Sequence, residues 1–264
     1  MFDIYKTMWQ KRKMINELAK QDIKTEYAGT LLGMMWGLIN PLLRIGVYWF
    51  VFSVGARAGH PVNGAPYIGW LAIGLVAWFF INDAFKLAKN SFRSKRSIIK
   101  NTPFPIAILP AEKVLYAYYI HLILLAAILL VMAVAFKSAS IYWLQIFYYD
   151  FAACMLLIAL GSVTAPLVAV SKDFSHFIDT FLVFLFWMTP ILWSVDNVHS
   201  RLQYIIKLNP IHYIIQGYRD SFFYGVGFWE HPVYTLYFWG FVFVTLVLGN
   251  YLFKRMKPVF LDIL

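Results

Sequence analysis

Charged residues are scarce in this sequence of 264 residues, because only 14% are Asp, Glu, Lys or Arg while 61% are hydrophobic. An average soluble domain has about 25% charged residues. The composition therefore excludes a soluble protein and indicates that lipid surrounds most of the chain. Each crossing of the bilayer core takes about 20 helical residues. The length accommodates roughly six crossings and leaves no room for a soluble domain of any size.

Residues and motifs that carry bond chemistry are also scarce. The single cysteine, Cys154, lies inside an apolar run, so an internal disulfide is excluded. The sequence lacks a phosphate-binding loop motif, a Cys/His metal-ligand spacing and a nucleophile motif. His121 stands alone in an apolar run, where packing or hydrogen bonding explains it. We therefore expect no catalytic residue and no metal site in this chain.

Six apolar runs are long enough to cross a membrane. Backbone polar groups in lipid must be paired within their own segment, so each run is expected to form a helix. The alternating pattern of membrane barrel strands is absent. The six predicted spans are Leu31–Val54, Pro66–Phe85, Ile106–Phe136, Ile141–Val170, Phe177–Ser194 and Pro232–Phe253. The expected fold is an all-α membrane protein with six transmembrane helices.

Basic residues are distributed unequally between the two sides that six spans create. Of the 23 lysines and arginines, 16 lie on the side that holds both termini, the loop after the second span and Lys172. Those on the other side are Arg57, Lys137, Arg201, Lys207 and Arg219. The positive-inside rule then places both termini in the cytoplasm. The net charge of +10 forms a belt that faces anionic lipid headgroups, and no nucleic-acid partner is expected.

Residues 1–30 predict a cytoplasmic amphipathic helix that lies in the membrane interface, ahead of a single transmembrane domain in residues 31–264. Apolar and polar side chains recur at helical spacing on opposite faces. The apolar face comprises Met8, Ile15, Leu18, Ala19, Ile23 and Tyr27, and the polar face comprises Lys13, Asn16, Lys20 and Lys24.

Between the fifth and sixth spans, residues 209–223 predict a short helix. Asn209 suits the N-cap and Pro210 the first helical position. Its apolar face comprises Ile211, Ile214, Ile215, Tyr218 and Phe222, and another face comprises His212, Gln216 and Arg219. Roughly thirteen residues are too few to cross a bilayer. We expect a short external or re-entrant helix that pairs with a second one in residues 198–208.

Arg44 lies about midway along the first span, three residues after Pro41. An arginine there costs roughly 2.5–3.5 kcal/mol on insertion and usually faces a cavity or a partner. One interpretation is a cation that faces an aqueous path for an anionic cargo. The other is a structural pair with a carbonyl or a carboxylate, although Asp83 is expected too near the cytoplasmic surface to lie level with Arg44.

Two further features have a plain and a functional interpretation. Some aromatic residues lie mid-span, where an interfacial belt does not explain them, and these suit either packing or the passage of sugar rings: Tyr48, Trp49, Phe181, Phe184 and Trp187. The loop Lys89–Lys100 predicts a short basic helix that ends before Pro103. It binds lipid headgroups, docks into a cytoplasmic motor, or does both.

Several stretches carry a family resemblance. The interfacial helix and residues 27–42 (YAGTLLGMMWGLINPL) resemble the opening of the ABC-2 polysaccharide-exporter permeases. Residues 187–191 (WMTPI) and 208–210 (LNP), followed by Arg219, resemble the second half of that family. Residues 39–42 (INPL) with 47–52 (VYWFVF) are most similar to the teichoic acid translocation permeases of Gram-positive bacteria.

The resemblance implies a homodimer of permeases in the bacterial cytoplasmic membrane, with two separate ATPase subunits that bind the ATP and Mg²⁺. The chain would then be no enzyme by itself and would hold no cofactor. The cargo would be wall teichoic acid on an undecaprenyl diphosphate lipid. The substrate path would include Arg44, Tyr48, Phe181, Phe184 and Trp187. The external gate would include Asn209, Pro210, His212, Gln216 and Arg219. The contact with the ATPase would include Phe92, Arg93, Lys95, Arg96 and Ile98.

Three alternatives remain at this point. The first is an exporter of O-antigen or capsular polysaccharide, which differs only in cargo. The second is an ABC-2 exporter of drugs or small lipids. The third is a membrane-embedded transferase that acts on lipid-linked sugars, which would need acidic or histidine clusters at one membrane face that the sequence does not show.

Overall fold

The computed structural model describes residues 3–55, 60–136 and 140–263. Arg57 and Lys137, two of the basic residues predicted on the outer side, fall outside these ranges. The described residues are mostly helical and contain no strand, apart from an isolated bridge between Val62 and Ala65. The expected all-α class is confirmed.

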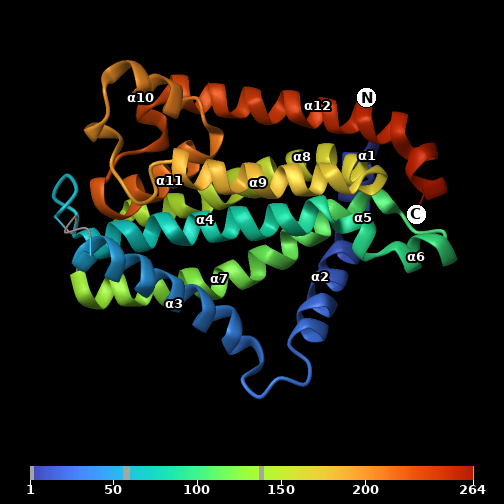
Figure 1. The fold of residues 1–264 in the computed structure, drawn as a ribbon, viewed down its shortest axis with the longest axis horizontal. Coiled ribbons are helices and arrows are strands. Elements are labelled where there is room, and N and C mark those ends of the chain that lie inside the picture. Colours follow the sequence, from blue (N-terminus) through green and yellow to red (C-terminus); the bar gives the residue numbers. More distant parts are fainter. Residues whose placement is uncertain (1–2, 56–59, 137–139, 264) are drawn as a thin grey trace.

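The long helices run side by side as a bundle, with the short helices at its two ends (Figure 1). The α-helices are α1 (Asp3–Gln10), α2 (Arg12–Glu26), α3 (Trp36–Trp49), α4 (Tyr67–Lys89), α5 (Ser91–Ser94), α6 (Arg96–Asn101), α7 (Leu109–Phe136), α8 (Ile146–Val170), α9 (Lys172–Met188), α10 (Ser200–Lys207), α11 (Pro210–Arg219) and α12 (Pro232–Ile263). Both chain ends, α5 and α6 lie at one end of the bundle, and α10 and α11 lie at the other (Figure 1).

Short 3₁₀ or π-helical segments extend or connect several of these helices. The 3₁₀ segments are Gly33–Met35, Ile106–Ile108, Ile141–Gln145, Val195–Asn197 and Phe228–Glu230. The π-helical segments are Phe50–Gly55, which continues α3, and Asp220–Tyr224, which continues α11.

Among the described residues, five helical segments are long and apolar enough to cross a membrane. These segments are Gly33–Gly55, Tyr67–Lys89, Ile106–Ala135, Ile141–Val170 and Pro232–Val259. They coincide within a few residues with five of the six predicted spans. The chain is therefore a multi-pass membrane protein.

The predicted fifth span is displaced in the structure. Its helix, α9, begins at Lys172 and ends at Met188, so it starts and stops earlier than the predicted Phe177–Ser194. The Ser171 side chain accepts a hydrogen bond from the Asp173 backbone at the start, and Thr189, which precedes Pro190, is extended at the end. At 17 residues, α9 is about 26 Å long, slightly less than a bilayer core of about 30 Å. A sixth crossing therefore stays a prediction.

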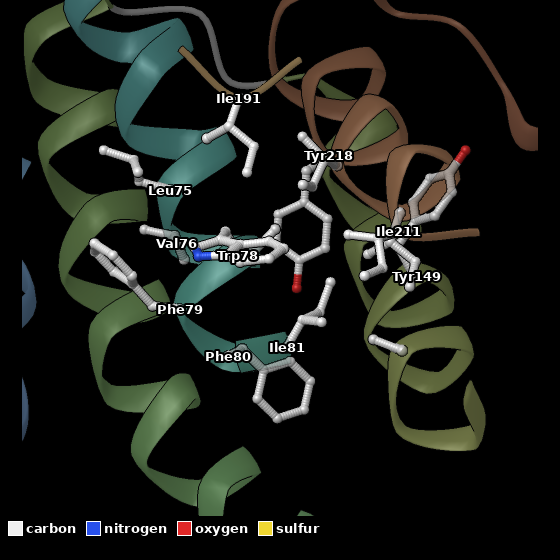
Figure 2. Close-up of a cluster of buried hydrophobic side chains, with 14 of the residues drawn as sticks. Leu75, Val76, Trp78, Phe79, Phe80, Ile81, Tyr149, Ile191, Ile211 and Tyr218 are labelled. Atoms are coloured by element: carbon white, nitrogen blue, oxygen red, sulfur yellow. The ribbon is translucent and has the colours of Figure 1, made fainter. Parts of the chain in front are cut away.

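The core of the bundle is built around α4. The helix is apolar on all sides, as expected for a helix surrounded by others, and every residue from Gly69 to Ile81 is buried. Figure 2 shows Tyr218 of α11 beside Trp78 of α4, with Tyr149 of α8 on the far side of Tyr218, next to Ile211. By contrast, Ile45 alone is buried within α3. The first span thus lies on the outside of this single chain.

The N-terminal segment forms two helices, because the predicted single helix is interrupted at Lys11 between α1 and α2. Met8 and Ile15, from its predicted apolar face, pack with Ile108 at the start of the third span. Asp3 of α1 forms an ion pair with Lys254 of α12. The apolar face is thus covered in part by the bundle itself.

Candidate functional site

Three of the predicted path residues line one cavity between α3, α4 and α9. Arg44 and Tyr48 of α3 and Trp187 of α9 surround it, and its volume is about 540 Å³. Phe186 of α9 lies between neighbouring rings, with its centroid 5.5 Å from that of Tyr48 and 5.4 Å from that of Trp78. The structure therefore brings the first span and the α9 segment together, as the path requires.

The surroundings of Arg44 differ from those expected. Its guanidinium carbon lies 5.8 Å from the centroid of the Phe79 ring, within the range of a cation–π contact. Asp83, which was expected to lie at a different depth, is within electrostatic reach of Arg44. The cation is exposed on this chain and has a carboxylate nearby.

Phe181 and Phe184 do not line this cavity but continue an exposed aromatic ladder along α9. The ring of Phe181 stacks on that of Phe177 at 6.1 Å and on that of Phe184 at 6.0 Å between centroids. All three side chains are exposed on the chain by itself. An aromatic surface thus runs along α9 beside the exposed face of α3.

All five predicted gate residues line a second cavity, at the α10–α11 end of the bundle. Asn209 caps α11, because its side chain accepts a hydrogen bond from the backbone N–H of Ile211, and Pro210 takes the first helical position. His212 and Arg219 are almost fully buried, and Gln216 is half-buried. The predicted cap and the predicted second helix, α10, are both confirmed.

Arg219 fastens α11 to the chain that follows α9. Its two terminal nitrogens donate hydrogen bonds to the backbone carbonyls of Pro190 at 2.6 Å and Ile191 at 2.8 Å. The guanidinium lies 3.4 Å from the centroid of the Trp70 ring. A Cβ atom on Gly74 would lie 2.6 Å from it, so glycine makes the room. Burial lowers the pKa of Arg219 to about 9, which is still above neutral pH, so the group remains charged.

The residues of the predicted ATPase contact differ in exposure, and one of them is buried. The loop after α4 forms two short helices, α5 and α6, where one was expected. Phe92 lies in the core with its ring against Phe253, so it is not available to a partner. Arg96 and Ile98 are exposed, and Arg93 is half-buried.

The same loop is joined to the N-terminal helices. Asp22 of α2 forms ion pairs with Lys95, at 2.6 Å, and with Lys113 of α7. Lys89, which was expected in the basic belt, is instead buried against Asp179 of α9 at 2.7 Å. Two lysines counted in the solvated belt therefore also connect parts of the fold: Lys89 connects α4 to α9, and Lys95 connects the α5–α6 loop to α2.

A buried polar cluster of Asp150, His121 and Tyr218 was missed from the sequence. His121 Nε2 lies 3.3 Å from Asp150 Oδ1 and 3.0 Å from the Tyr218 hydroxyl, which also bonds to Asp150. The hydrogen-bonding role expected for His121 is thus confirmed. A lone carboxylate in an apolar run was the available signal. Within the described ranges, no group of three or more His, Cys, Asp or Glu residues is placed to hold a metal.

The chain is similar to known proteins over most of its length. A family model described as ABC-2 type transporter matches residues 15–223, from within α2 to the end of the α11 region. Two O-antigen export system permease proteins RfbA of Klebsiella pneumoniae are 27% and 26% identical to this chain, over 94% of it and 93% of each relative. An O-antigen export system permease protein RfbA of Myxococcus xanthus is 22% identical, over 84% of this chain and 85% of the relative.

These relatives change the expected cargo. Their names refer to O-antigen, so the teichoic acid expectation is not supported, and the O-antigen alternative fits better. The family match covers most of the chain and includes the α3 and α9 segments, the α5–α6 loop and α11. The chain belongs to the ABC-2 type transporter family.

Proposed function

We propose that this chain is the membrane permease of an ABC exporter that carries an O-antigen-type polysaccharide out of the cytoplasm. Similarity over nearly the whole chain to O-antigen export permeases is the observation that carries the proposal. The chain itself has no phosphate-binding loop, so a partner ATPase supplies the energy.

The exposed aromatic surface supports this function. The stacked rings of Phe177, Phe181 and Phe184, together with Trp187, offer flat apolar contacts along α9. Such contacts hold a sugar ring weakly, without the directional hydrogen bonds that would arrest a moving chain. Because α3 and α9 both lie on the outside of one chain, a second copy facing them would enclose a path. We therefore include a homodimer and a lipid-linked polymer in the proposal.

The exposed side chains of the α5–α6 loop are the proposed contact with the ATPase. Arg96 and Ile98 are exposed at the same end of the bundle as both termini. Ion pairs through Asp22 connect this loop to α2 and α7. A movement of the loop would therefore be transmitted to α2 and α7.

Deletion of the gene in its bacterial host tests the proposal. We expect long polysaccharide to disappear from the cell surface and to accumulate inside, and a plasmid copy of the chain to restore it. The accumulated polymer also identifies the cargo class. A sugar polymer without a phosphate in each repeat supports O-antigen export. A polymer with one phosphate in every repeat would instead identify the cargo as a teichoic acid. Unchanged surface polysaccharide would refute the proposal.

A further inference from the structure

The cavity at the α10–α11 end has the size of a small-molecule site. Its volume is about 280 Å³, close to the lower limit of about 300 Å³ for ligand pockets. It shares no lining residue with the cavity beside Arg44. The two cavities are thus distinct, and this one is too small for more than about one sugar residue.

Aromatic side chains form much of the wall. They include Tyr149, Tyr213, Tyr224, Phe228 and Tyr234. A Cβ atom on Gly217 would overlap the Tyr149 ring, so the glycine lets this ring pack directly on α11. Tyrosines combine an apolar ring with a hydroxyl that can donate and accept hydrogen bonds. Such a wall suits a ligand that is apolar on its faces and polar around its edge.

Two buried polar atoms of lining residues have no hydrogen-bond partner among the described residues. They are His212 Nδ1 and Arg219 Nε, on side chains that are 5% and 1% exposed and line the cavity. A buried donor or acceptor left unpaired costs about 1–3 kcal/mol. Burial lowers the pKa of His212 to about 3, so the imidazole is neutral at pH 7. One of its ring nitrogens then donates and the other accepts, as a ligand hydroxyl requires.

The charges around the cavity balance. Asp196 and Asp220 contribute carboxyl groups, and Lys207 and Arg219 contribute cations. The Gln216 amide donates to Asp220 at 2.9 Å, which leaves its carbonyl oxygen for another donor. An anionic ligand such as a phosphate gains little from such a lining, while a neutral ligand rich in hydroxyls finds donors and acceptors on several sides.

We propose that this cavity is a saccharide site, which binds one neutral sugar ring from the end of the exported polymer. A pyranose ring has apolar C–H faces and a rim of hydroxyls that both donate and accept. These two features match the aromatic wall and the unpaired groups of His212 and Arg219. The identity of the sugar as part of the cargo rests on the proposed function, but the existence of the site does not.

The site is tested on the complex of the full chain with its ATPase, in lipid nanodiscs. Saturation-transfer NMR is recorded with the methyl glycosides of glucose, galactose, mannose, rhamnose and N-acetylglucosamine, with sorbitol and methyl phosphate as comparison probes. We expect signals from at least one glycoside and none from sorbitol or methyl phosphate.

Variants locate the binding. Gln216→Leu and Tyr234→Leu should each weaken glycoside binding about tenfold or more, a loss of about 1.4 kcal/mol. Gln203→Leu is the matched control, because Gln203 lies on α10 and does not line the cavity. Tyr234 is exposed at the start of α12, so its substitution leaves folding intact should Gln216→Leu not fold. An equal loss in the control would contradict the assignment.

Three outcomes overturn the inference: no glycoside signal, glycoside binding that neither pocket variant weakens, or binding of methyl phosphate alone. None of these depends on the deletion experiment. If the polymer accumulates on deletion but no glycoside binds, the saccharide site is wrong and the proposed function stands. If glycosides bind in the cavity but deletion leaves surface polysaccharide unchanged, the proposed function fails and the site stands.

Discussion

Replacing Tyr218 by phenylalanine removes one oxygen from the point where α7, α8 and α11 meet. The Tyr218 hydroxyl bonds to Asp150 and lies 3.0 Å from His121 Nε2. The Tyr218 side chain is fully buried, so phenylalanine keeps the ring contacts. After the change, Asp150 keeps the 3.3 Å contact with His121 and the interaction with the neighbouring Tyr118 hydroxyl.

The expected loss of stability follows from these contacts. A buried acceptor left unsatisfied costs about 1–3 kcal/mol, while hydrogen bonds between membrane helices average about 0.6 kcal/mol and reach about 1.7. Asp150 Oδ2 has no hydrogen-bond partner among the described residues, so the carboxyl group is short of donors even before the change. We therefore expect Tyr218→Phe to lower the free energy of unfolding by about 1–2 kcal/mol.

Equilibrium unfolding in mixed detergent micelles, followed by circular dichroism, measures this loss. Tyr251→Phe is the control, since Tyr251 is exposed on α12. Combining Tyr218→Phe with Asp150→Leu closes a double-mutant cycle, in which the loss from Tyr218→Phe should largely vanish. If Tyr218→Phe costs no more than Tyr251→Phe, or costs the same in both backgrounds, the cluster does not stabilise the bundle.

Three other predictions concern the proposed path, the ATPase contact and the topology. Arg44→Gln should leave membrane abundance normal but reduce the export rate about tenfold, which corresponds to a rise of roughly 1.4 kcal/mol in the activation free energy. Arg44→Lys keeps the charge and should therefore export at a reduced rate. Export by the glutamine variant at the wild-type rate would show that Arg44 is not part of the path. Ile98→Asp should release or uncouple the ATPase while the chain still inserts, which co-purification and ATPase assays measure; a fully coupled complex would rule out this contact. Single cysteines at Ser94 and Ser200, in a cysteine-free background, should react with an impermeant thiol reagent from opposite sides, and labelling of both from outside intact cells would contradict the topology.

Features that depend on local sequence were predictable. The fourth span, Ile141–Val170, has the predicted bounds, because length and apolarity define a spanning helix without reference to its neighbours. The cap at Asn209 and the start of α11 at Pro210 also follow from adjacent residues alone. The end of α9 was also predictable, because Thr189 precedes Pro190 and the residue before a proline disfavours the helical conformation. The predicted span nevertheless extended to Ser194, because the residues after Met188 are mostly apolar.

Features that depend on contacts between distant residues were not predictable. The basic pattern around Lys89 looked like a solvated loop, yet its ammonium group reaches Asp179, 90 residues later, in the folded chain. Asp150, His121 and Tyr218 come from three different helices, so spacing along the chain cannot join them. Phe92 shows the same limit, because its partner Phe253 lies near the other end of the sequence.

The teichoic acid expectation lacks support for a different reason. It rested on two short stretches of the first span, residues 39–42 and 47–52. The similarity to O-antigen export permeases extends over 94% of the chain. A membrane-facing helix is constrained mainly to be apolar and aromatic, so short matches within it arise easily between exporters of different polymers.

The two helices at the α10–α11 end are held with very different strength, and this decides which of them can move. Seven residues of α11 are buried, and Arg219 bonds it to Pro190 and Ile191. By contrast, α10 has no buried residue. Each large apolar side chain that is buried contributes about 1.5–3 kcal/mol, so displacing α11 costs far more than displacing α10. All five predicted gate residues belong to α11 and its cap, and we therefore expect them to form the fixed side of any opening while α10 moves. Hydrogen exchange should protect the amides of residues 211–219 far longer than those of residues 201–207. Equal protection of the two helices would contradict this assignment.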